Sequence, residues 1–104
     1  MPESPYQAIA DPTRRAILAV LKADGPLKAG DLAERFPRIS RPAVSKHLRV
    51  LRAARLVAPR KDGREVWYRL EADPLSQVLQ WLDQYEDFWR DRLTRLKEAV
   101  ENED

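Results

Sequence analysis

The sequence predicts a mainly α-helical domain that carries one small β-hairpin, an α+β fold class. Apolar residues recur at helical spacing in several segments, and two short strand-like runs flank Asp62-Gly63. A chain of 104 residues suits one domain, here 1–104, with only a modest core. A core of that size favours further stabilisation by dimerisation.

The N-terminal quarter predicts a short helical turn near residues 6–9 and then a longer helix. Asp11 and Pro12 are typical of a helix start, because an aspartate caps the first turn and proline fits its first position. Gly25-Pro26 ends this helix.

A helix-turn-helix is expected over about 28–54. Residues 28–36 have an amphipathic helical pattern, although Lys28 stands where a capping serine or threonine is expected. Ser40 can cap the following helix, which has Pro42 in its first turn.

A hairpin, or wing, is predicted over about 56–70. Residues 56–61 and 64–70 have strand patterns on either side of a tight turn at Asp62-Gly63. Pro59 cannot donate a ladder hydrogen bond, so its strand is expected at a sheet edge.

One long helix is predicted over about 74–101, after a second acid-proline start at Asp73-Pro74. Its apolar residues form two stripes. One stripe contains Leu75, Val78, Leu79, Leu82, Trp89, Leu93 and Leu96, and the other contains Trp81, Tyr85 and Phe88. One stripe is enough to dock the helix on its own domain. Burying both needs a second surface, and a two-fold copy of the chain is the simplest one.

Positive charge is concentrated in the middle of the chain. From Arg35 to Arg69, eleven lysines and arginines stand against two acids, a balance of +9, whereas the whole chain carries only +2. Such a basic block indicates a protein that binds the phosphate backbone of nucleic acid.

The predicted helix after Ser40 has a basic, polar face opposite its apolar stripe. A helix of this kind fits the major groove, where Arg41 and Arg49 can each donate two hydrogen bonds to a guanine. Arg52 lies nearer the phosphates. The candidate DNA-binding residues are Ser40, Arg41, Pro42, Ser45, Lys46, Arg49 and Arg52 on the helix, with Arg60, Lys61 and Arg64 at the hairpin tip.

Functions other than DNA binding fit this sequence less well. A charged helix face is usually only solvated, but the adjoining basic hairpin favours DNA. A winged helix that binds another protein instead is the alternative, although it needs no basic wing. Ser45 and His47 diverge on a helix and no acid orients the histidine, so we expect no enzymatic activity. We expect His47 to pack or form hydrogen bonds near the helix edge.

Composition excludes several further classes. The chain has no cysteine and one histidine, so we expect no metal site, no thiol switch and no cofactor. No apolar run is as long as a membrane span, which needs about 20 residues. The N-terminus lacks the basic-then-apolar pattern of a signal peptide. A soluble cytoplasmic protein without a membrane partner is the resulting expectation.

The segment from Asp11 to Leu70 resembles the ArsR family of bacterial winged helix-turn-helix repressors. The resemblance lies in DPTRRAIL from Asp11, DLA from Asp31, VSKHLRVL from Val44, Leu56-Val57, and GREVWYRL from Gly63. It implies a symmetric dimer that binds an inverted-repeat operator and blocks transcription. By position, the family's groove-facing residues fall on Arg41, Pro42, Ser45 and Lys46.

The resemblance also implies that the last helix is a dimerisation helix, which pairs with the N-terminal helix of the partner. The candidate interface residues are Tyr6, Ile9, Leu79, Trp81, Leu82, Tyr85, Phe88 and Trp89. Three features depart from the family pattern: cysteine is absent, the last helix has no histidine, and Arg55 replaces the glycine that usually ends the recognition helix. The chain looks most like the metal-independent branch, so the expected signal is a partner protein, an apolar effector or dilution alone.

Overall fold

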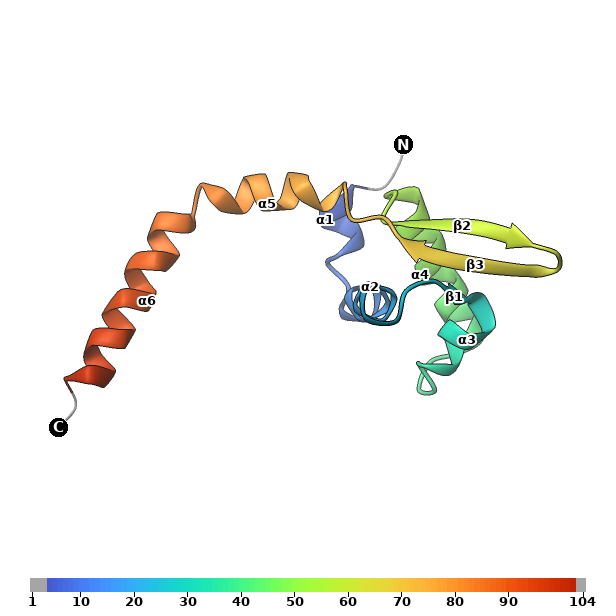
Figure 1. The fold of residues 1–104 in the computed structure, drawn as a ribbon, viewed down its shortest axis with the longest axis horizontal. Coiled ribbons are helices and arrows are strands. Elements are labelled where there is room, and N and C mark those ends of the chain that lie inside the picture. Colours follow the sequence, from blue (N-terminus) through green and yellow to red (C-terminus); the bar gives the residue numbers. More distant parts are fainter. Residues whose placement is uncertain (1–3, 103–104) are drawn as a thin grey trace.

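The computed structural model describes residues 4–102 and has extents of 62 × 33 × 21 Å. A body of helices and one sheet carries a C-terminal arm that projects from the end opposite the hairpin (Figure 1). The elements are α1 (Pro5–Ala8), α2 (Pro12–Asp24), β1 (Leu27–Lys28), α3 (Ala29–Glu34), α4 (Arg41–Ala53), β2 (Val57–Asp62), β3 (Glu65–Leu70), α5 (Leu75–Asp83) and α6 (Glu86–Glu101). The mainly helical fold with a small wing is confirmed. Along residues 4–102, no helix is long and apolar enough to cross a membrane.

The sheet is antiparallel and its strand order is β1-β3-β2. Pro59 lies on β2 at the sheet edge, as predicted. The two-residue strand β1, which pairs with β3, was missed because so short a segment has no strand periodicity. The turn was also misplaced by one residue, since Asp62 pairs with Glu65 and Gly63-Arg64 forms the loop. Gly63 has φ 63°, and a positive φ at the first loop position suits glycine.

The core lies where α2, α3 and α4 meet the sheet. Its fully buried large side chains are Ile17, Val44, Leu32, Leu51 and Leu56. These residues come from the predicted apolar faces of the three helices and from the start of the wing. The core fixes α4 and the wing relative to each other, which positions the candidate DNA-binding residues.

Helix α2 begins as predicted, with Pro12 at its first position and Asp11 as its cap. The Asp11 carboxylate accepts a hydrogen bond from the backbone amide of Arg14 at 3.0 Å. That bond is the main reason why the pKa of Asp11 is lowered from its ordinary value of 3.8. The ionised cap therefore stabilises the folded state.

We expect Asp11→Ala to lower the free energy of unfolding by about 1 kcal/mol at neutral pH. Because the folded pKa lies below the unfolded one, this contribution is complete above the unfolded pKa and is lost as pH falls through the folded pKa. Chemical denaturation at neutral and acidic pH measures the difference. Asp11→Asn is the matched control, because asparagine also caps helices but does not titrate. A constant difference between Asp11 and Asp11→Asn across that range would contradict the assignment.

Helix α4 has a defined structure at both ends. The hydroxyl of Ser40 accepts a hydrogen bond from the amide of Ala43 at 3.2 Å, as predicted for its N-cap. At the other end, Arg55 has φ 62°. The amide of Arg55 donates to the carbonyl of Arg52, and the amide of Leu56 donates to the carbonyl of Leu51. These two bonds form a Schellman motif. A non-glycine residue in this conformation costs roughly 1 kcal/mol.

The prediction of a single C-terminal helix over 74–101 is wrong, because the chain forms two helices, α5 and α6, that meet at an angle (Figure 1). In a continuous helix, the backbone amide of Tyr85 would donate to the carbonyl of Trp81. Here the side-chain amide of Gln84 donates to that carbonyl. The amide of Tyr85 bonds to the carbonyl of Leu82 instead. Asp73 makes no side-chain cap, and α5 begins at Leu75 after Pro74.

Candidate nucleic-acid interface

Helix α4 presents two unlike faces. Val44, Leu48 and Leu51 are buried against the body. The opposite face is exposed along its whole length, and it carries Ser40, Arg41, Pro42, Ser45, Lys46, Arg49 and Arg52. The helix therefore lies with its polar face outward, as the sequence predicted.

The cations on this face are not neutralised by the protein. Within residues 4–102, ion pairs link other groups, and none involves Arg41, Lys46, Arg49 or Arg52. Arg38, in the turn before Ser40, is likewise exposed and was not among the predicted site residues. Its place in the basic block was the only signal for it. An exposed, uncompensated set of cations on one helix is suited to an anionic surface.

The wing does not group its three predicted cations on one surface. Arg60 stands opposite Trp67 and Lys61 stands opposite Val66, and successive side chains of a strand point to opposite faces. Tyr68, on the Lys61 side of the sheet, packs against the core. Arg60 therefore lies on the outer face of the wing, separated from Lys61.

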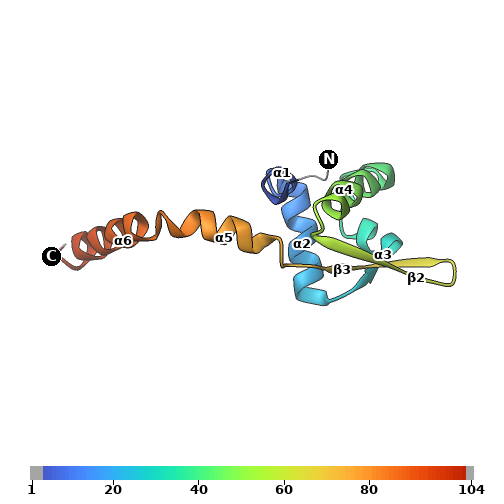
Figure 2. The same ribbon diagram turned by 90° about the horizontal axis from the view of Figure 1, so that it is seen from above.

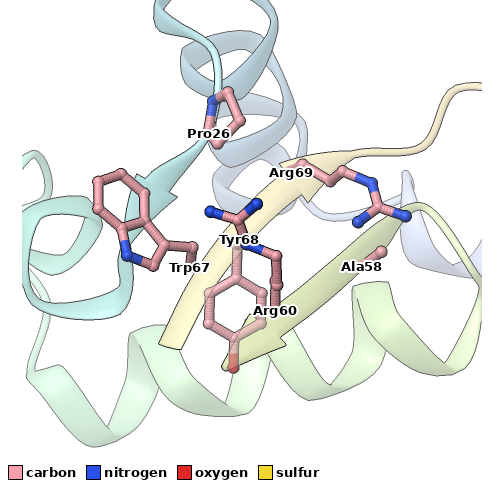
Figure 3. Close-up of a pocket in the computed structure, with 6 residues that line it drawn as sticks. All are labelled: Pro26, Ala58, Arg60, Trp67, Tyr68 and Arg69. Carbon is pink, nitrogen blue, oxygen red and sulfur yellow. The ribbon is translucent and has the colours of Figure 1, made fainter. Parts of the chain in front are cut away.

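The outer face of the wing holds a shallow pocket (Figure 3). Its lining residues are Pro26, Ala58, Arg60, Trp67, Tyr68 and Arg69. The guanidinium of Arg69 is held by Glu71 at 2.9 Å, and the ammonium of Lys28 lies 5.4 Å from the centre of the Trp67 ring. A volume of about 80 Å³ is far below that of a typical ligand site. We therefore do not assign a ligand to this pocket.

His47 lies at the edge of α4 and is half-buried, as predicted. Its Nδ1 is 3.5 Å from a guanidinium nitrogen of Arg14. Arg14 also donates to the carbonyls of Ala8 and Gln7 at 2.6 and 3.0 Å. Arg14 thereby ties α1 to α2 and α4, a role that no sequence pattern indicated.

The predicted dimer-interface residues form an exposed aromatic and aliphatic surface along α1, α5 and the start of α6. Tyr6, Leu79, Trp81, Leu82, Tyr85, Phe88 and Trp89 are exposed, and Ile9 is half-buried. Tyr6 donates to the carbonyl of Gln77 at 3.0 Å and its ring meets that of Trp81 edge-on at 6.4 Å. These contacts join α1 to α5 within one chain and leave the outer side of both helices open.

No metal site is apparent in the part of the chain that the structure describes. No group of three or more His, Asp or Glu side chains there is close enough to hold an ion. The acids of α6 pair instead with cations of the same helix, for example Asp91 with Arg95 at 3.0 Å.

The fold and the basic face of α4 define a winged helix-turn-helix protein, a DNA-binding transcriptional regulator. A family model described as a helix-turn-helix domain matches residues 9–60. The HTH-type transcriptional regulator Rv2034 of Mycobacterium tuberculosis is 44% identical over 98% of this chain and 91% of its own length. The transcriptional repressor SdpR of Bacillus subtilis is 40% identical over 74% of this chain and 83% of its own.

A solved structure of an ArsR family transcriptional regulator superposes with a TM-score of 0.71 at 34% identity, covering 82% of this chain and 86% of that one. The chain therefore belongs to the ArsR family, as its sequence resemblance implied. These relatives are named as regulators, which agrees with the expectation of no enzymatic activity.

Proposed function

We propose that this protein is a homodimeric repressor that binds an inverted-repeat DNA operator and does not sense metals. The observation that supports the proposal most is the face of α4, whose exposed cations have no acidic partner within residues 4–102. The repressor role is further supported by the 40% identity to a protein named as a transcriptional repressor.

The roles of individual residues follow from their positions. Arg41 and Arg49 lie on the exposed face of α4 and have the length and fork geometry to contact guanine edges in the major groove. Ser45, between them, is small enough for the helix to approach the bases. Arg52 lies in the last turn of α4 and Arg64 at the tip of the wing, and we assign both to phosphate contacts.

The test of this proposal is a set of alanine variants. We expect Arg41→Ala and Arg49→Ala each to weaken operator binding by about 1–3 kcal/mol and to relax preference at particular base pairs. Arg64→Ala, at the wing tip, is the matched control and should weaken all sequences alike, because it meets backbone. Fluorescence anisotropy on operator and scrambled duplexes measures both effects. Sequence selectivity that depends on Arg64 and not on Arg49 would reverse these roles.

The same measurement separates the alternative function. A winged helix that serves only as a protein-interaction module would bind duplex DNA weakly even at low salt. Its basic wing and the unpaired cations of α4 would then have no function, which is why we favour DNA.

We expect stoichiometric Zn²⁺, Ni²⁺ and arsenite, as well as thiol oxidants, to leave operator affinity unchanged. The chain has no cysteine. Its single histidine, His47, lies on α4, the helix that we assign to DNA recognition, beside Arg14 of α2. Binding titrations with and without each agent measure this. A shift of about tenfold, equal to about 1.4 kcal/mol, would reveal a site shared between subunits. Relief of repression is expected from a partner protein, an apolar effector between the aromatic stripes, or dilution.

A further inference from the structure

Helix α1 lies where the C-terminal arm meets the body, at the start of α2 and in contact with α5 (Figures 1 and 2). It has only four residues, Pro5–Ala8. An isolated helix of that length is unstable in water, because too few hydrogen bonds offset the cost of ordering its first turn. Contacts with the rest of the chain must therefore hold α1 in place.

Two consecutive arginines at the start of α2 supply such contacts. The guanidinium of Arg14 donates to the carbonyls of Ala8 at 2.6 Å and of Gln7 at 3.0 Å. The guanidinium of Arg15 donates to the carbonyls of the next two residues along the chain, at 2.7 and 3.3 Å. The last carbonyls of a helix lack partners within the helix, and the two arginines provide them here. We call Arg14 and Arg15 the arginine clamp.

The clamp also reaches the recognition helix. The remaining guanidinium nitrogen of Arg14 lies 3.5 Å from Nδ1 of His47 on α4. Arginine can only donate, so Nδ1 is the acceptor, and the distance is at the long limit for a hydrogen bond. All three guanidinium nitrogens of Arg14 therefore face groups of the chain itself. Arg14 differs in this from the cations on the outer face of α4, such as Arg49.

The other side of α1 is joined to α5. The hydroxyl of Tyr6 donates to the carbonyl of Gln77 at 3.0 Å, and its ring meets that of Trp81. Helix α5 is also anchored at its first residue, because Leu75 packs against the core. A helix held at one end can pivot, and a second attachment fixes its direction. The contacts through α1 provide that second attachment.

We propose that Arg14 and Arg15 are positioning residues for DNA binding, which set the spacing of the two half-sites that the protein reads. The inference rests on the homodimer proposed above. In that dimer, the surface of α1 and α5 fixes the place of the second chain, and α4 fixes the place of the DNA. The clamp holds these two surfaces of one chain at a constant angle, and this angle determines how far apart the two recognition helices lie.

A small change in this angle has a large effect on the fit to DNA. One additional base pair moves the half-sites apart by about 3.4 Å and turns one relative to the other by about 35°. A rigid dimer therefore fits one spacing. A dimer with a loose α1 adapts to several spacings, but it binds the best one less tightly, because the effective concentration of the second half-site falls.

The test compares DNA duplexes that differ only in spacing. One is the duplex that the unaltered protein selects from a random-sequence pool, two others have one base pair inserted or removed between the half-sites, and a fourth contains a single half-site. We expect the unaltered protein to prefer the selected spacing by at least about tenfold. Fluorescence anisotropy gives the affinities, at protein concentrations above the dimer dissociation constant that sedimentation finds for each variant.

Arg14→Lys/Arg15→Lys is the first variant, because it keeps both positive charges and removes the guanidinium forks. It should reduce the spacing preference to about threefold or less and keep the half-site affinity within about twofold. Arg14→Met/Arg15→Met removes the donors altogether and should relax the preference further. The loss of two charges acts on every spacing alike, so it cancels in this ratio.

Arg35→Lys is the matched control. It makes the same chemical change at an arginine that pairs with Asp24, the last residue of α2 and the one farthest from α1 along that helix. The spacing preference should stay as in the unaltered protein.

Two results would overturn the inference and leave the proposed function intact. One is an equal spacing preference in the unaltered protein and both clamp variants. The other is an equal loss of affinity for the half-site and for every spacing, which is what a purely structural role of the clamp predicts. An unaltered protein that selects no duplex, or binds its duplex as a monomer, would contradict the proposed function and this inference with it.

Discussion

The affinity of this protein for its operator is expected to fall by roughly 10³–10⁵ between about 50 and 200 mM monovalent salt. The reason is the release of counterions from phosphates that lysine and arginine neutralise. Each chain presents exposed cations on α4 and at the wing tip, among them Lys46, Arg49, Arg52, Lys61 and Arg64. In the proposed dimer, two chains on one operator would supply the roughly 6–10 phosphate contacts that such a salt dependence requires.

The measurement is a series of binding isotherms plotted as log affinity against log salt concentration. Arg64→Ala should reduce the slope by roughly one unit for each phosphate contact that is lost. Lys22→Ala is a suitable control, because Lys22 lies in the last turn of α2, outside the basic block, and should leave the slope unchanged. A nearly flat response of the unaltered protein would remove the DNA-binding proposal as stated.

The parts of the fold that depend on local chemistry were predictable from the sequence. Asp11 and Ser40 cap their helices because each places a side-chain oxygen against the amide three residues later. The apolar stripe of α4, from Val44 to Leu51, is the buried face, and its opposite face is therefore exposed. The same periodicity placed every candidate DNA-binding residue of α4 on the outside.

The parts that depend on tertiary contacts or on competing hydrogen bonds were not predictable. Strand β1 exists because β3 supplies its partner, with Leu27 opposite Tyr68. At the break between α5 and α6, the side-chain amide of Gln84 and not a backbone amide bonds to the carbonyl of Trp81, which no apolar periodicity indicates. Strand alternation alone separates Arg60 from Lys61, but which of the two lies on the outer face depends on which side of the wing packs against the core, the side of Tyr68.

The break at Gln84 changes how the two predicted apolar stripes should be understood. A continuous helix would carry both stripes along one rod, but here each stripe is divided between two helices that point in different directions (Figure 1). The surface around Tyr6, Leu79 and Trp81 adjoins the body, whereas Leu93 and Leu96 lie far along the arm. The chain therefore exposes apolar side chains both beside the body and along the arm.

Trp81→Asp is expected to convert the protein into a monomer at micromolar concentration and to weaken operator binding by about 10²–10⁴-fold. Trp81 is 49% exposed and packs between Tyr6 and Tyr85, with ring centres 6.4 and 5.3 Å away. An aspartate there would bring an unpaired charge into an otherwise neutral interface, and its partner would bring a second one by symmetry.

The loss of DNA affinity follows from geometry. A two-fold dimer sets two recognition helices about 34 Å apart, one turn of DNA, so that the second half-site is bound at high effective concentration. A monomer retains only the contacts of one α4 and one wing. Sedimentation equilibrium gives the oligomeric state, and anisotropy on full operator and half-site duplexes gives the two affinities.

Gln80→Asp is the matched control, since it places the same charge on the neighbouring, exposed position of α5. It should leave both the dimer and operator binding intact. We expect Trp81→Asp to keep the body folded, because Trp81 is 49% exposed and is not part of the buried core. Thermal unfolding by circular dichroism checks this. A folded Trp81→Asp monomer that still binds the full operator as tightly as the unaltered protein would contradict the dimeric model, because one recognition helix would then account for the entire affinity.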